Sequence, residues 1–307
     1  MFWLLWQYSY LHDPRHSRPY RESRTYSVIP DLLVSRHHIV IPDLIEKQAL
    51  QSFPTLSGIQ TKIKMNKRHL TYFVSDVHLG LNVEDPAARE ARFVSFLREI
   101  PAEETDALYL LGDIWDFWYE YRDVVPKGYV RVFAALCDLM DRGVKVFFFQ
   151  GNHDVWTYSY FEELGMKRLE QPYVTDIAGK RFCLGHGDGL GPVSFGYRFL
   201  RSVFHCRFLQ VLFSMLHPWL AFRFGNNWSK NNRLSHSEQY VFSGSEEPLY
   251  QFALKYSSEN PVDYFIFGHY HDDVRMTLPS GAQFHILKDW IQGSPYIVFD
   301  GTDVRVC

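Results

Sequence analysis

Five apolar segments of the chain each end at a short turn that carries aspartate, asparagine or histidine. The first segment covers residues 70–74 and is followed by Asp76 and His78. It is rich in aromatic and β-branched residues and stops at a small polar turn, which is typical of a buried strand. Ligand sites in layered α/β proteins lie outside the carboxyl ends of such strands. This segment alone is weak evidence, because a short Asp-x-His pattern also occurs at ordinary turns.

The same arrangement recurs four more times along the chain. The other apolar segments cover residues 107–111, 144–149, 181–184 and 264–267. The polar residues that follow them are Asp113, Asn152, His186, and the pair His269 and His271. Each of these has an ordinary interpretation as a turn residue, a core histidine or a surface pair, but five together are hard to attribute to chance. Carboxylate oxygens and imidazole nitrogens suit Zn, Mn or Fe.

The pattern between the strands predicts helices, beginning with one over residues 86–100. Asp85 and Pro86 stand where an N-cap and a first helical residue are expected. A second helix is predicted over 130–140, and four short strands after residue 273 are predicted to close the fold as an antiparallel set. Strands separated by helices indicate an α/β layered domain.

Composition excludes several classes of protein. With 307 residues and 46% hydrophobic residues, the chain can bury one sizeable core or two smaller ones. A net charge of −3 is too small to attract the whole protein electrostatically to nucleic acid or to a membrane. Four scattered cysteines without a CxxC pair favour a reducing cytoplasm. Since no run of about 18 apolar residues occurs, we expect no membrane span.

Residues 1–64 differ from the rest of the chain. They contain scattered proline, histidine and arginine and show no sustained period, whereas clean patterning begins at Met65. We therefore predict a leader over 1–64 that is disordered or not part of the native product, followed by one domain over 65–307.

The five turns, read in order, resemble the calcineurin-like metallophosphoesterase superfamily over about residues 70–300. They read Asp-x-His, Gly-Asp, Gly-Asn-His-Asp, Gly-His-Gly-Asp and Gly-His-x-His. The resemblance implies a four-layer αββα sandwich of two mixed sheets, with two metal ions at the strand ends. It implies one ion held by Asp76, His78, Asp113 and His271, and another held by Asp113, Asn152, His186 and His269, with Asp113 bridging.

Two divalent cations about 3.5–4 Å apart can lower the pKa of a shared water, and a bridging carboxylate offsets their repulsion. We expect two divalent ions, with manganese first, although iron and zinc accept the same ligands. His153 is the candidate catalytic residue, as a proton donor or a stabiliser of developing charge. Asp154, Asp188 and Asp272 either orient ligand imidazoles or are solvated turn residues.

The residues after Asp113 narrow the resemblance. Ser/Thr protein phosphatases have Val-Asp-Arg-Gly here, whereas this chain has Ile114-Trp115-Asp116-Phe117-Trp118. That run, with His186–Pro192 and Asp289-Trp290-Ile291, is similar to the UDP-2,3-diacylglucosamine hydrolases of lipid A synthesis. The resemblance implies cleavage of UDP-2,3-diacylglucosamine to UMP and 2,3-diacylglucosamine 1-phosphate. The chain departs from the best-known members at His153, where they have arginine, and at Leu287-Lys288-Asp289, where a turn richer in Asn and Gly is expected.

The stretch from Gly189 to Ser237 contains no acidic residue, several arginines and many large apolar side chains. Pro218 interrupts it, which predicts two helices forming a cap inserted at about 189–245. A single apolar helical face is predicted for Phe204, Phe208, Val211, Leu212 and Met215. Such a cap suits an anionic lipid with acyl chains. The alternatives are a buried helical hairpin and, less favoured because the stretch is so apolar, a nucleic-acid groove; we expect no nucleic acid.

We expect Ser229, Lys230 and Arg233 to contact the substrate phosphates. The predicted location is cytoplasmic, peripheral on the inner face of the cell membrane. A soluble metal-dependent phosphodiesterase or nucleotide hydrolase is the alternative function. A non-catalytic scaffold on this fold is disfavoured, because all seven ligand positions are present.

Overall fold

The computed structural model describes residues 68–225 and 242–307, which belong to a compact unit, Asn66–Cys307. The predicted leader over 1–64 lies outside the described residues. So do the predicted substrate contacts Ser229, Lys230 and Arg233.

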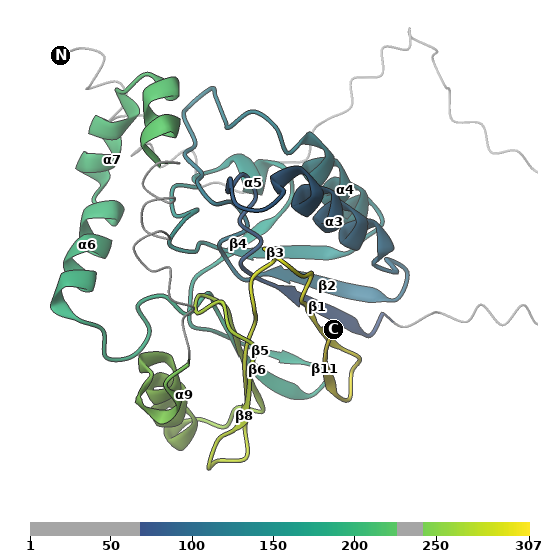
Figure 1. Cartoon of the computed structure of the whole chain (residues 1–307). Helices are drawn as coiled ribbons and strands as arrows, with labels where there is room; N and C mark the ends of the chain where they lie inside the picture. Colours follow the sequence, from purple (N-terminus) through teal and green to yellow (C-terminus); the bar gives the residue numbers. More distant parts are fainter. Residues whose placement is uncertain (1–67, 226–241) are drawn as a thin grey trace, which may run out of the picture. The chain divides into compact units, whose positions relative to one another are not determined.

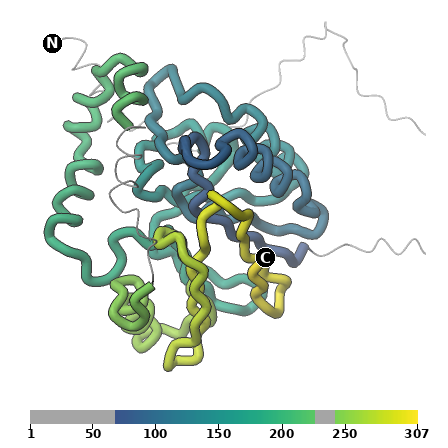
Figure 2. The backbone as a smooth tube through the Cα atoms, viewed as in Figure 1, coloured from purple at the N-terminus to yellow at the C-terminus, as the bar shows by residue number. Residues whose placement is uncertain are grey.

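A six-stranded mixed sheet has the order β11-β10-β1-β2-β3-β4. Strands β1, β2, β3 and β4 run parallel to one another, whereas β10 pairs antiparallel with both β1 and β11. Figure 2 shows the yellow segment near the C-terminus running beside the dark blue segment that contains β1. The strands are β1 (Leu70–Val74), β2 (Thr105–Leu110), β3 (Lys145–Phe149), β4 (Lys167–Leu169), β10 (Ile297–Phe299) and β11 (Val304–Val306).

A five-stranded mixed sheet has the order β5-β6-β7-β9-β8. Its central strands β6, β7 and β9 are parallel, and both edge strands are antiparallel to their neighbours. The prediction of one antiparallel C-terminal set was wrong, because β8 and β9 join this sheet while β10 and β11 join the other. The strands are β5 (Tyr173–Ile177), β6 (Lys180–Leu184), β7 (Tyr264–Phe267), β8 (Val274–Thr277) and β9 (Gln283–Ile286).

Alternation of side chains along the strands divides the core into three layers. Along β2, Leu108 and Leu110 pack with helices α3 and α4, whereas Tyr109 packs toward the second sheet. Along β7, Phe265 packs with helix α9 and Ile266 packs between the sheets. The two sheets therefore face each other between helices, which confirms the αββα sandwich (Figure 1). These helices are α3 (Pro86–Glu99), α4 (Val130–Asp141), α5 (Tyr160–Glu163) and α9 (Pro248–Glu259), with a 3₁₀ turn η2 (Gly244–Glu246).

Helix α3 begins as its sequence predicts. Asp85 is the N-cap, and its Oδ1 accepts the backbone N–H of Ala87 and of Ala88, both at 3.0 Å. Pro86 occupies the first turn, where its missing N–H needs no partner.

The stretch after β6 forms helices α6 (Phe195–His205) and α7 (Arg207–Ser214), followed by helical residues 218–225. Figure 1 shows α6 and α7 beside the sheets rather than on their outer faces. The predicted single face over 204–215 was wrong, because the chain breaks at Cys206 and Phe204 lies on the other helix. The carbonyl of Phe204 accepts Trp156 Nε1–H at 3.0 Å and Gln210 Nε2–H at 2.8 Å. Side chains thus satisfy a group that a continuous helix would use itself.

The apolar side of these helices is exposed. Helix α6 has no buried residue, and Phe195, Phe199, Phe208 and Trp219 are 77%, 63%, 66% and 60% exposed. The alternative of a buried helical hairpin was therefore wrong for residues 195–225. We call the exposed set of Phe195, Phe199, Phe208 and Trp219 the apolar patch.

Two further findings concern the predicted class of protein. Within 68–225 and 242–307, no helix is long and apolar enough to cross a bilayer. Cys137, Cys183, Cys206 and Cys307 are free thiols.

Candidate metal centre

The turns that follow the strands have an unusual backbone conformation. Eight non-glycine residues among those described have a positive φ, and five of them are predicted ligands: Asp76, His78, Asp113, His269 and His271. For a side chain other than glycine this conformation costs about 1–2 kcal/mol. Strain of this kind collects at functional sites, where the surrounding structure holds it in place.

The first half of the site is a tight group of four side chains. Asp76, His78, Asp113 and His271 each offer a ligand atom, and these atoms lie within 4.8 Å of one another. Asp76 Oδ1 lies 3.6 Å from His78 Nε2 and 3.2 Å from His271 Nε2. The two Nε2 atoms are 3.2 Å apart.

The second half surrounds His186. Its Nε2 lies 3.4 Å from Asp113 Oδ2 and 3.2 Å from Asn152 Oδ1. The His269 ring lies 5.1 Å from the His186 ring, and the His269 backbone N–H donates to Asp76 Oδ2 at 3.0 Å. The structure therefore brings all seven predicted ligands together. Asp113 Oδ2 lies between the halves, since it is also 3.9 Å from His78 Nε2.

The outer nitrogens of three histidines show that this cluster suits a cation. His78 Nδ1 lies 3.3 Å from Asp116 Oδ1, His271 Nδ1 lies 3.2 Å from Asp289 Oδ2, and His186 Nδ1 lies 3.0 Å from the carbonyl of Leu111. Carboxylates and carbonyls only accept, so each Nδ1 carries a hydrogen. Each Nε2 of a neutral ring then points a lone pair at carboxylate oxygens. Buried acceptors that face one another need positive charge between them, so the residues fit divalent cations.

Electrostatics lead to the same conclusion. Burial opposes ionisation of Asp113, yet His186 and His153 hold its pKa well below the ordinary value. Burial likewise opposes ionisation of Asp76, while contacts with His271 and His78 keep its pKa low. Burial lowers the pKa of His186, but Asp113 raises it to about 10, so that in the absence of a cation a proton on Nε2 supplies the positive charge beside Asp113. The two carboxylates therefore stay ionised and attract positive charge.

His153 lies at the rim of the cluster. Its backbone N–H donates to Asp113 Oδ1 at 2.8 Å, and its Nδ1 lies 2.9 Å from the carbonyl of Asp116. Its side chain is 18% exposed, whereas His78 is fully buried. His153 thus contacts the cluster and is also accessible to solvent.

Comparison with known proteins agrees with this geometry. A family model described as calcineurin-like phosphoesterase matches residues 70–273, which include all seven predicted ligands. The chain belongs to the calcineurin-like phosphoesterase family. It is a metal-dependent phosphoesterase with a buried cluster of histidine and aspartate side chains.

Two curated relatives narrow the position of this phosphoesterase within the family. The UDP-2,3-diacylglucosamine hydrolase of Porphyromonas gingivalis is 37% identical over 76% of this chain and 95% of its own length. The enzyme of the same name from Proteus mirabilis is 33% identical over 74% of this chain and 94% of its own. The phosphoesterase is therefore related to UDP-2,3-diacylglucosamine hydrolases.

Sequence reasoning missed the two carboxylates that orient ligand imidazoles. Asp116 contacts His78 and Asp289 contacts His271 through Nδ1. The sequence signal was present, because Asp116 lies within the aromatic run after Asp113 and Asp289 precedes Trp290. The three carboxylates that were predicted to orient ligand imidazoles contact other groups instead. The carboxylate oxygens of Asp154, Asp188 and Asp272 accept hydrogen bonds from backbone N–H groups or from side chains other than the ligand histidines.

Asp154 instead fastens two ligand loops together. Its carboxylate accepts the backbone N–H of Gly151 at 2.7 Å, of Ile114 at 2.9 Å and of Asp113 at 3.3 Å. Burial and the nearby charge of Asp113 raise the pKa of Asp154 to about 7. The loop after β3 thereby holds the backbone on both sides of Asp113.

Glycine is required at position 151 because the backbone there lies very close to Asp113. A Cβ at this position would overlap Oδ1 and the backbone nitrogen of Asp113. We expect Gly151→Ala to lower the free energy of unfolding by about 1–3 kcal/mol, as for other overpacked positions. It should also weaken metal binding, because Asp113 must move. Thermal unfolding and metal titration measure both effects.

The matched control is Gly196→Ala. Nothing lies within 4 Å of a Cβ at Gly196, which belongs to α6. This variant should keep wild-type metal binding and stability. If both variants behave alike, the close approach at Gly151 has no role in placing Asp113.

Proposed function

We propose that this phosphoesterase hydrolyses the pyrophosphate bond of UDP-2,3-diacylglucosamine, releasing UMP and 2,3-diacylglucosamine 1-phosphate for lipid A biosynthesis. The similarity to the P. gingivalis enzyme over 95% of its length supports this substrate. The seven-residue cluster supports a pair of divalent cations, for which we propose manganese.

The position of α6 carries the proposal. On one side of this helix, Arg201 pairs with Asp188 and Tyr197 OH donates to the same carboxylate at 3.4 Å. Asp188 is buried and lies two residues from the proposed ligand His186. The other side of the helix exposes Phe195 and Phe199. One helix thus joins the loop of the cluster to an apolar surface, as a substrate with a phosphate head and acyl chains requires.

The side chains of the cluster would have distinct roles. When bound, the cations would supply positive charge that activates water and offsets charge on the phosphoryl oxygens. Asp76, His78 and His271 would hold one ion, Asn152, His186 and His269 the other, and Asp113 both. The neutral Asn152 amide adds no negative charge, which favours binding of phosphoryl oxygens on its side.

His153 would transfer a proton to the leaving oxygen. Its Nδ1 hydrogen is directed at the carbonyl of Asp116 at 2.9 Å, which fixes the ring. Nε2 is therefore the ring atom that can exchange a proton with substrate.

The direct test is to incubate the purified protein with manganese and UDP-2,3-diacylglucosamine and to follow UMP. We expect UMP and the acylated sugar 1-phosphate in equal amounts. Absence of UMP, with turnover of a simple nucleotide diester, would instead favour a soluble phosphodiesterase or nucleotide hydrolase.

We further propose that the apolar patch rests on the membrane that holds the substrate. Arg198 and Arg223 are exposed beside it, and the Arg223 guanidinium lies 5.4 Å from the centre of the Trp219 ring. Apolar side chains flanked by cations suit the boundary of an anionic leaflet.

We expect the double variant Phe199→Ser/Phe208→Ser to bind anionic phospholipid vesicles at least about a hundredfold more weakly. Burying each phenylalanine contributes about 1.5–3 kcal/mol, and every 1.4 kcal/mol is about tenfold in affinity. Vesicle sedimentation measures the change. Val130→Ser is the matched control, since Val130 is 74% exposed on α4. Equal binding by both variants would contradict the membrane contact.

A further inference from the structure

The two halves of the cluster differ in the groups that contact the outer ring nitrogen, Nδ1, of their histidines. In the first half, His78 and His271 each face a carboxylate through Nδ1, Asp116 at 3.3 Å and Asp289 at 3.2 Å. In the second half, His186 faces the neutral carbonyl of Leu111 at 3.0 Å.

Among residues 68–225 and 242–307, the carboxylate within 4 Å of a His186 nitrogen is the shared Asp113, which contacts Nε2 rather than Nδ1. The neutral member of the second half, Asn152, contributes an amide oxygen, 3.2 Å from His186 Nε2. The nearby carboxylate of Asp188 is paired with Arg201 and also accepts a hydrogen bond from Gln171 Nε2 at 2.7 Å. Its charge is thus balanced by a guanidinium.

The charges behind the first half are poorly screened. The side chains of Asp116 and Asp289 are 4% and 14% exposed. Charges removed from water act more strongly on their neighbours than surface charges do. A carboxylate on the outer nitrogen of an imidazole also makes the inner nitrogen a better ligand.

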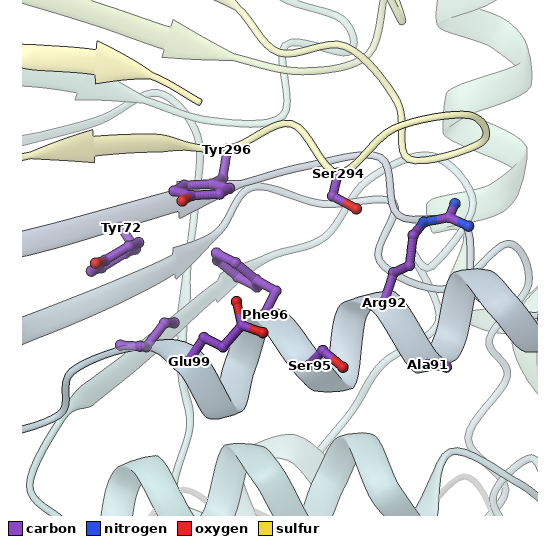
Figure 3. Close-up of a pocket in the computed structure, with 9 residues that line it drawn as sticks. Tyr72, Ala91, Arg92, Ser95, Phe96, Glu99, Ser294 and Tyr296 are labelled. Atoms are coloured by element: carbon purple, nitrogen blue, oxygen red, sulfur yellow. The ribbon is translucent and has the colours of Figure 1, made fainter.

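Asp289 is held firmly in this position. Arg92 Nη2 on α3 donates to the carbonyls of Trp290 at 2.9 Å and of Ile291 at 3.2 Å. The Trp290 ring packs edge-on against Phe96, with centroids 5.4 Å apart. Figure 3 shows Arg92 and Phe96 extending from α3 toward the segment with Ser294 and Tyr296, around a pocket of about 420 Å³. The backbone next to Asp289 is therefore anchored to α3, and Asp289 Oδ1 also accepts the backbone N–H of Ile291 at 2.9 Å.

We propose that the two cation sites are unequal, and that the half formed by Asp76, His78 and His271 fills first and more tightly. The inference rests on the proposed dimetal function. Asp113 serves both halves and cannot distinguish them. The difference arises because the carboxylates of Asp116 and Asp289 contact the imidazoles of the first half. In the second half, the nearby groups are either neutral, as the Leu111 carbonyl is, or paired with a cation, as Asp188 is with Arg201. Loading of the Asn152 and His186 half then sets the metal concentration at which the enzyme becomes active.

Titration of the metal-free protein with Mn²⁺ tests the order of loading. Calorimetry gives the affinities, and electron paramagnetic resonance counts free Mn²⁺. We expect two steps that differ at least about tenfold in affinity, because one outer partner changes metal affinity about 10–100-fold. Asp116→Asn and Asp289→Asn should each weaken the tighter step about 10–100-fold. His186→Ala should remove the weaker step and leave the tighter one.

Asp106→Asn is the matched control for charge. Asp106 is a surface carboxylate paired with Lys145 at 3.0 Å, and its loss should leave both steps unchanged. Circular dichroism of each metal-free variant establishes that it folds. Two equal steps in the wild type, or loss of the tighter step in His186→Ala, would overturn the inference while leaving a dimetal enzyme. Failure to bind any Mn²⁺ would overturn the proposed function as well.

Discussion

Replacing Asp113 by alanine is expected to reduce kcat/KM for UMP release by more than about 10⁴-fold, because both cations lose a ligand at once. Asp113 Oδ2 is the carboxylate oxygen within 4 Å of a histidine from each half, His78 and His186. Its Oδ1 also accepts the backbone N–H of His153, so the loop after β3 loses an anchor. The measurement is steady-state turnover at saturating manganese, with bound metal counted in the same sample.

His153→Ala is the comparison that gives this result its meaning. General acid catalysis contributes about 10²–10⁴-fold, and His153 lies outside the seven proposed ligands, so its loss should cost about 10²–10³-fold and leave metal content unchanged. Equal residual rates in the two variants would contradict the bridging role of Asp113.

Complete removal of both divalent cations is expected to abolish turnover and to lower the melting temperature by about 10–20 °C. Metal at a hundred times its dissociation constant stabilises a protein by about 2.7 kcal/mol per site, and 1 kcal/mol shifts the melting temperature of a domain this size by roughly 2–4 °C. Acceptors such as the buried Asp76 Oδ1 and the partly exposed His271 Nε2, 3.2 Å apart, are left facing each other when the ion leaves.

The experiment compares chelated, dialysed protein with the same sample after Mn²⁺ is restored. Asp113→Ala protein, treated identically, provides the control and should show a much smaller shift on chelation. A wild-type protein that keeps its activity or its melting temperature after chelation would show that the cluster does not need metal.

The seven proposed ligands could be predicted from sequence because each follows a strand within four residues. This pattern can be read from neighbouring residues in the sequence. Because β1, β2 and β3 are parallel, the turns that follow them lie at the same edge of the sheet. The outer carboxylates could not be predicted in the same way. Asp116 meets His78, and Asp289 meets His271, across different loops, so the pairing depends on how those loops pack.

The helices after β6 show a similar limit. Their apolar and basic composition was visible in the sequence. At the break at Cys206, however, the carbonyl of Phe204 accepts a hydrogen bond from Trp156, a residue of another loop, and local sequence does not show this contact. Apolar periodicity also did not distinguish a buried face from an exposed one. Phe208 and Val211 both belong to α7, yet Phe208 is 66% exposed and Val211 is 6% exposed.

The most direct test of the account is anomalous diffraction from crystals of the protein grown with manganese. Two peaks are expected on either side of the Asp113 carboxylate. One should lie against Asp76, His78 and His271, and the other against Asn152, His186 and His269. A single peak, or peaks that do not share Asp113, would contradict the claim that these seven side chains hold a pair of cations.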